Sequence, residues 1–116
     1  MNKYAQIATI AIEYINKGLS AEQAWEKSSC EIFTRGSASQ VKGCPKNAFL
    51  GLFSNDNKIN HNKNALYARK ALSILKENPN KRFSQKELWS LVTDEPKTHN
   101  SQMDVVFALW NKHLIK

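Results

Sequence analysis

Residues 20–25 read SAEQAW, and the chain repeats this pattern at residues 84–89 as SQKELW. In both stretches a serine is followed three positions later by glutamine or glutamate, which is the capping box that begins a helix. A tryptophan follows two positions after that residue, at Trp25 and at Trp89. We therefore expect two equivalent helices whose indoles anchor the core, and we expect Trp110 of the last helix to share the same interior.

The likeness extends on both sides of these helices and covers most of the chain. Three further matches support it: Tyr4-Ala5 with Tyr67-Ala68, Ser39-Gln40 with Ser101-Gln102, and residues 48–53 (AFLGLF) with residues 105–110 (VVFALW). The first copy contains five additional residues, 43–47, before its last match. We predict an all-α protein with one domain over residues 1–116, a compact bundle of about six helices in two pseudo-repeated three-helix halves, 1–57 and 63–116.

Helical periodicity is also present outside the capping boxes. Between residues 4 and 17, apolar side chains recur every three or four positions, which is typical of a helix with a wide buried side. Pro45 is predicted at the first position of a short helix that ends at Phe53, because its missing N–H would be unpaired there in any case. Ser101 is predicted to open the last helix. The polar residues 54–64 favour a turn-rich connector, and no sustained alternation indicates strands.

The composition is typical of a globular protein in water. Of the 116 residues, 41% are hydrophobic and 23% are charged, and no apolar run approaches the roughly 18 residues that a membrane span needs. Polar residues interrupt the first helix and no cleavage-site pattern follows it, which argues against a signal peptide. We therefore expect a soluble, cytoplasmic protein without a membrane partner. The two cysteines, Cys30 and Cys44, are too few for a disulfide framework, so we expect them to be reduced.

The net charge of +7 is concentrated in one segment. Residues 58–86 contain eight lysines and arginines but a single acid, Glu77. On the predicted helix 63–76, small and apolar residues share one side and basic residues the other, so the helix would present a basic face that attracts polyanions. Nucleic-acid binding is therefore one alternative function, with six candidate residues: Lys63, Arg69, Lys70, Lys76, Lys81 and Arg82. A solvated face is the simpler interpretation, because lysines predominate and the sequence predicts no exposed aromatic residue among them.

Residues that catalyse reactions or bind metals are sparse. Cys44 stands just before Pro45, where the N–H groups at a helix start would stabilise a thiolate, so a cysteine-dependent enzyme or redox sensor is a second alternative. The spacing of His61, His99 and His113 ties none of them to this cysteine, or to one another as metal ligands. A cysteine that simply packs in a turn is the simpler interpretation. We predict no enzyme activity, no cofactor and no metal site.

Two segments resemble the hallmark stretches of a small bacterial family of unknown function: residues 43–52, GCPKNAFLGL, and residues 99–106, HNSQMDVV. The first helix, the second helix and the helix from Asn64 are also similar, so the likeness covers nearly the whole chain. The resemblance implies a compact helical fold and brings no established activity. The family's pattern has a further cysteine where this chain has Phe53, and this departure argues against a paired-thiol role for Cys44.

A rigid helical surface without reactive groups favours a non-enzymatic protein-binding module, for example an immunity or antitoxin-like partner of another protein. Its contact surface is predicted in the two matching loops, residues 35–46 and 97–102, because matching loops of a repeat tend to be related by its pseudo-symmetry. The predicted contact residues are Arg35, Ser39, Gln40, Lys42, Cys44, Lys46, Lys97, His99, Asn100 and Gln102. The sequence defines no oligomeric state.

Overall fold

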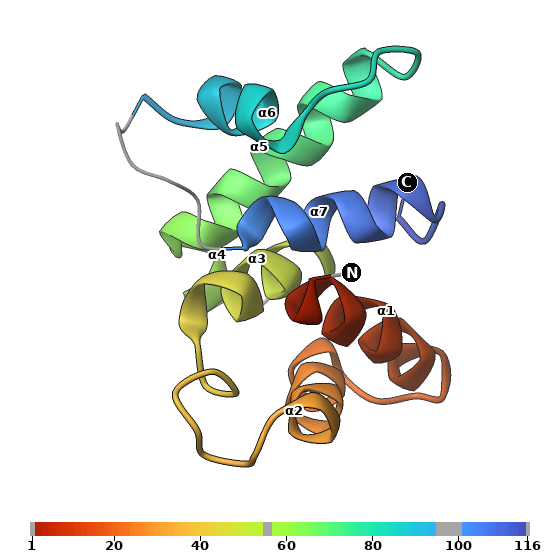
Figure 1. Cartoon of the computed structure of the whole chain (residues 1–116), viewed down its shortest axis with the longest axis vertical. Helices are drawn as coiled ribbons and strands as arrows, with labels where there is room; N and C mark the ends of the chain where they lie inside the picture. Colours follow the sequence, from red (N-terminus) through yellow and green to blue (C-terminus); the bar gives the residue numbers. More distant parts are fainter. Residues whose placement is uncertain (1, 55–56, 95–100, 116) are drawn as a thin grey trace.

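Seven α-helices make up the part of the chain that this computed structural model describes, residues 2–54, 57–94 and 101–115 (Figure 1). In chain order they are α1 (Lys3–Asn16), α2 (Ala21–Ile32), α3 (Gly43–Phe53), α4 (Asn57–Asn60), α5 (Lys63–Glu77), α6 (Gln85–Val92) and α7 (Gln102–Asn111). These residues contain no strand, so the predicted all-α fold is confirmed. Within the same residues, no helix combines the length and the apolar character needed to cross a bilayer.

Helices α2 and α6 begin with the capping boxes that the sequence predicts. The Ser20 hydroxyl accepts the Gln23 N–H at 3.1 Å, and the Gln23 side-chain oxygen accepts the Ser20 N–H, also at 3.1 Å. Ser84 and Glu87 make the same two bonds at 3.1 and 3.3 Å. Each box satisfies two N–H groups that would otherwise lack a partner at the helix start, so four consecutive residues fix where each helix begins.

Asparagine side chains cap α1 and α5, the two longest of the described helices. The Asn2 side-chain oxygen accepts the N–H groups two and three residues ahead, at 2.8 and 3.2 Å, at the start of α1. Asn62 does the same for α5, at 2.9 and 3.2 Å. The first helix of each predicted half therefore has the same kind of cap, and the second helix of each half has the same capping box.

The third helix of each predicted half begins without a side-chain cap. Helix α3 starts at Gly43, so Pro45 occupies the third helical position rather than the predicted first one. The proline fits there because a first-turn N–H has no partner within its helix. Ser101, before α7, has a φ of 68° and its hydroxyl does not cap the helix. Helix α4 lies inside the predicted connector, residues 54–64, and is one helix more than the prediction contains.

The helices of the two predicted halves interlock. The contact between α3 and α5 is the most extensive in the described bundle, and α7 packs against α1, so the third helix of each half lies on the first helix of the other. Figure 1 shows α7 passing between α5 and α1. Gly51 permits the close approach of α3 to α5, because a Cβ at this position would lie 2.6 Å from the Ala65 Cα. The repeat itself stays a prediction from the sequence.

Two clusters of buried side chains form the core. Trp25, 1% exposed, lies in the first cluster with its ring 5.1 Å from that of Phe49. Trp89, 7% exposed, lies in the second with its ring 5.0 Å from that of Tyr67. Trp110 is only partly buried, against the second cluster. The prediction of one shared interior for the three indoles is therefore wrong, because α3 and α7 contribute side chains to both clusters and lie between them.

Candidate functional site

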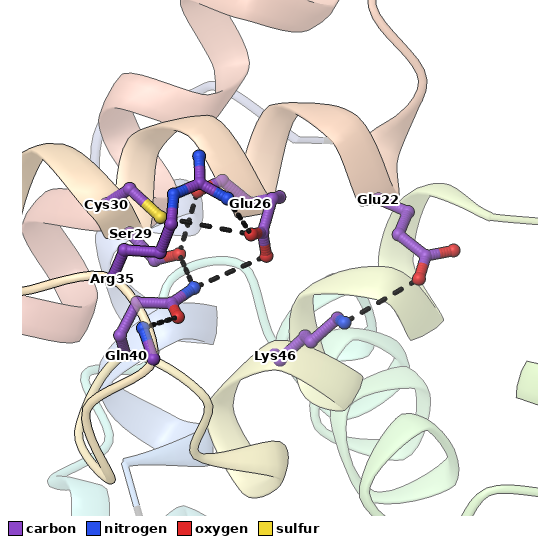
Figure 2. A network of polar contacts seen from close by, with 8 residues as sticks. Glu22, Glu26, Ser29, Cys30, Arg35, Gln40 and Lys46 are labelled. Atoms are coloured by element: carbon purple, nitrogen blue, oxygen red, sulfur yellow. Dashed lines mark hydrogen bonds and ion pairs between the residues drawn. The ribbon is translucent and has the colours of Figure 1, made fainter.

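The α2–α3 loop, residues 33–42, contains most of the described part of the predicted contact surface, and Gln40 holds it in place (Figure 2). The Gln40 side-chain oxygen accepts the Gly36 N–H at 3.0 Å. Its amide nitrogen donates to the Ser29 hydroxyl at 2.9 Å and to the Glu26 carboxylate at 3.3 Å. Gln40 is 4% exposed, so these bonds form away from competing water. They tie the inside of the loop to α2.

The Glu26 carboxylate accepts hydrogen bonds from several donors on the outer side of this network. The Arg35 Nη1 lies 3.3 Å from the Glu26 Oε1, and the Cys30 thiol donates to the same oxygen at 3.9 Å (Figure 2). The Arg35 side chain is 75% exposed, so water screens this ion pair and it adds at most ~1 kcal/mol to stability. Its main effect is positional, because it holds the guanidinium against the base of the loop.

Helix α1 holds the opposite side of the loop. The Tyr4 hydroxyl donates to the Ser39 carbonyl at 2.9 Å, and the Tyr4 ring lies 5.4 Å from the ring of Phe33. The Lys42 ammonium lies 5.4 Å from the centre of the Tyr4 ring, which is a cation–π contact. The beginning, the middle and the end of the loop therefore each have an anchor on a neighbouring helix.

Lys46 joins the first turn of α3 to α2. Its Nζ lies 3.6 Å from the Glu22 Oε1 (Figure 2). A polar hollow of about 250 Å³ lies beside this pair and extends to Lys58 and Asn62 near the connector. Arg35 in the loop and Lys46 just beyond it are thus each paired with a carboxylate, whereas Lys42 contacts the Tyr4 ring instead.

The predicted contact residues differ in how far their side chains are exposed to water. Arg35 and Ser39 are exposed, whereas Lys42, Cys44 and Lys46 are partly buried. These five residues lie on one continuous stretch of chain that runs through the loop and into α3. Three further predicted contact residues lie outside the described part of the chain: Lys97, His99 and Asn100.

Gln40 and Gln102 are predicted contact residues that the structure places in the interior. They are 4% and 2% exposed. The Gln102 amide donates to the Asn64 side-chain oxygen at 2.9 Å, which joins the start of α7 to the start of α5. A buried amide needs such partners because an unpaired one costs about 1–3 kcal/mol. We therefore correct their assignment: both side chains support the chain from within and do not face a partner.

Val41 is a loop residue that the sequence analysis missed. It is 58% exposed, more than Leu66 or Leu91, the other large hydrophobic side chains that stand out into water in the described residues. The signal that could have found it is a lone apolar residue between polar neighbours in a predicted loop. Covering such a side chain with a partner removes apolar surface from water, which favours association.

The basic residues of the nucleic-acid alternative do not all share one face. Arg69 turns inward: its Nε donates to the Gly51 carbonyl at 2.6 Å and a terminal nitrogen donates to the Ser54 carbonyl at 3.2 Å. These carbonyls belong to the end of α3, where the helix offers them no partner. The predicted place of Arg69 on the outer face is therefore wrong. The other five candidates are exposed: Lys63, Lys70, Lys76, Lys81 and Arg82.

Cys44 is a partly buried free thiol at the second position of α3. No described residue makes a hydrogen bond with its sulfur, and His61 and His113 are both exposed to water. Among the described residues, no three histidine, cysteine or acidic side chains group as ligands for a metal ion. A reactive role for this thiol stays a prediction.

A protein-family model matches the whole chain, residues 1–116, and describes a family of unknown function (DUF6979). The chain belongs to this family. The expectation of an uncharacterised family is thereby confirmed. No curated protein and no solved structure matches the chain. The function of this DUF6979 protein must therefore be argued from its own surfaces.

Proposed function

We propose that this DUF6979 protein is a non-enzymatic protein-binding module, immunity or antitoxin-like in kind, whose contact surface is the α2–α3 loop. The observation that supports it most is the bracing of the loop. The buried Gln40 amide makes one hydrogen bond within the loop and two to α2, while Arg35 and Val41 stay exposed. A loop already held in one conformation loses less conformational entropy on binding, which favours recognition of a partner.

The exposed side chains of the loop suit a protein partner that offers a small apolar patch beside an acidic group. Val41 supplies apolar surface. Arg35 is paired with Glu26 on one side, but its guanidinium has five N–H donors and can also meet a carboxylate of the partner. We place the protein in the cytoplasm, where Cys30 and Cys44 would remain reduced.

The test is a Val41→Glu variant. Tagged wild-type and variant proteins are purified from the cells in which the protein naturally occurs, and co-eluting proteins are quantified by mass spectrometry. We expect the wild type to retain a specific partner and the variant to retain at least tenfold less, equivalent to about 1.4 kcal/mol of binding free energy. Because Val41 is 58% exposed, the unfolding midpoint of the variant should match that of the wild type.

Leu91→Glu is the matched control. Leu91 is 50% exposed on α6, so the same charge is added to a similar apolar side chain away from the loop. Partner recovery by L91E but not by V41E would support the loop surface. Equal loss in both variants, or no partner recovered under several growth conditions, would contradict the proposal.

A further inference from the structure

A groove runs between the end of α5, the connector to α6 and the second half of α7. Two adjoining hollows form it, with volumes of about 660 and 480 Å³, and Pro79 and Trp110 line both of them. Figure 1 shows the elements that carry these residues: the upper end of α5, and the end of α7 beside the C mark. Ligand sites usually have volumes of about 300–1,000 Å³, so the groove is large enough for a ligand of nucleotide size.

The lining of the groove includes an indole that has no aromatic partner. Trp25 and Trp89 each pair with another aromatic ring in the core, whereas Trp110 has no aromatic or cation–π partner among the described residues. Phe83 and Phe107 line the same hollow. A partly exposed indole is a platform on which a flat group can stack. The sequence analysis found no such platform near the basic residues because the fold brings Trp110 to them from α7.

Three cations line the walls of the groove: Lys76, Lys81 and Arg82. None of them forms an ion pair with a described residue, and no described aspartate or glutamate lines either hollow. The Lys81 ammonium lies 4.7 Å from the centre of the Phe83 ring, and this cation–π contact holds the ammonium beside the aromatic residues of the groove. The groove therefore combines cations that have no carboxylate partner with aromatic side chains.

We propose that this groove binds single-stranded nucleic acid, with a base stacked on Trp110 and the neighbouring phosphates beside Lys76, Lys81 and Arg82. A single strand offers a flat base and a phosphate in every unit, so it matches both features of the groove. A duplex hides the faces of its bases. An acidic peptide is less evenly charged, and the eight basic residues against one acid in residues 58–86 favour the more uniform polyanion. This site is independent of the loop surface.

Fluorescence anisotropy with a labelled single strand about 12 nucleotides long, of thymidine or of uridine, tests the proposal on the full chain. With three phosphate contacts, we expect the affinity to fall about 20-fold when the salt concentration rises about fourfold. Arg82→Ala should remove about a third of this salt dependence. Lys70→Ala is the matched control, because Lys70 is exposed on the same helix as Lys76 but lines neither hollow, and it should have a smaller effect.

Intrinsic fluorescence reports the stacking separately. Trp25 and Trp89 are 1% and 7% exposed, so quenching on addition of the strand would come mainly from Trp110. Trp110→Phe keeps a ring in the groove and should keep the fold while losing the quenching. Trp110→Ala should weaken binding about tenfold or more, and its circular dichroism spectrum checks that it is folded.

Five results would overturn the proposal. The first is the absence of salt-sensitive binding to either strand. The second is equal affinity for a duplex of the same length, because a duplex hides the faces of its bases. The third is equal affinity for polyglutamate, because it has no bases. The fourth is binding without quenching, and the fifth is an equal effect of K70A and R82A. Either of these two would place the contact outside the groove.

Discussion

The loop surface and the groove lie on one helical scaffold but use their charges differently. In the loop surface, Arg35 and Lys46 each pair with a carboxylate, at 3.3 and 3.6 Å. In the groove, Lys81 and Arg82 have no carboxylate partner among the described residues. An ion pair fixes the position of a side chain. A cation without a carboxylate partner can still attract an anionic ligand. This difference fits the two proposals, which are recognition of a protein by the loop and attraction of a polyanion by the groove.

The contact between α3 and α5 supports both surfaces, so breaking it has the largest expected effect. Gly51→Ala would place a Cβ 2.6 Å from the Ala65 Cα and 2.7 Å from its carbonyl oxygen. Alanine gains at most ~1 kcal/mol in helix propensity. The clash is with backbone and can be relieved only by moving the two helices apart, so we expect a net loss of about 3 kcal/mol. Urea unfolding followed by circular dichroism measures this loss.

Gly43→Ala is the matched control in the same helix. A Cβ there would find its nearest neighbour, the Asn47 Nδ2, at 3.5 Å, which is ordinary contact. We expect no loss of stability in this variant. If G51A were as stable as G43A, the close approach of α3 to α5 would not be what holds the two surfaces together.

The next largest expected effect is that of a variant that should impair the loop surface and leave the groove intact. Gln40→Ala leaves the Gly36 N–H and the Ser29 hydroxyl without their partner in the loop, and we expect a loss of about 2 kcal/mol in the free energy of unfolding. The variant should also lose the protein partner but keep the affinity of the groove for a single strand. Urea unfolding and the two binding assays measure these three quantities.

Gln102→Ala provides the comparison at the matching position of the predicted repeat. It removes the bond to Asn64 and should lower stability without loosening the α2–α3 loop, so partner binding by the folded protein should persist. Equal partner loss in Q40A and Q102A would mean that global stability, rather than the bracing of the loop, controls binding.

Local sequence signals predicted the parts of the fold that depend on a few neighbouring residues. The capping boxes at Ser20 and Ser84 were predicted because every group involved lies within four positions. The start of α3 was misplaced because Lys42 makes no side-chain cap that a pattern could reveal. Helix α4 was missed because its four polar-rich residues have no periodicity of their own.

Contacts between distant residues explain what the sequence could not predict about the candidate sites. Arg69 finds its carbonyl partner 18 residues away, and Gln102 finds Asn64 at a separation of 38. Their polar side chains look like surface residues until the packing of α3 and α7 against α5 is known. The same packing brings Trp110 to the basic connector, which is why the groove emerged only from the structure.

The smallest expected effect concerns the hydrogen bond that joins Tyr14 of α1 to Glu31 of α2. The Tyr14 hydroxyl donates to the Glu31 carboxylate at 2.7 Å. This hydrogen bond, with smaller contributions from burial and from the charges of Glu31 and Glu13, raises the pKa of Tyr14 above its ordinary value of 10.0. The folded protein therefore holds the phenol proton more tightly than the unfolded chain does. The stability gained is complete below the ordinary value and is lost as the pH rises through the raised pKa.

Tyr14→Phe removes this contribution, so the wild type should be more stable than the variant at about pH 8, and the difference should shrink at about pH 11. Water reaches this hydrogen bond, so the difference should be smaller than that for Gln40→Ala. Glu31→Gln keeps a hydrogen-bond acceptor without the charge and should weaken the pH dependence. A stability difference that stays constant across this range would show that the Glu31 carboxylate does not hold the Tyr14 proton.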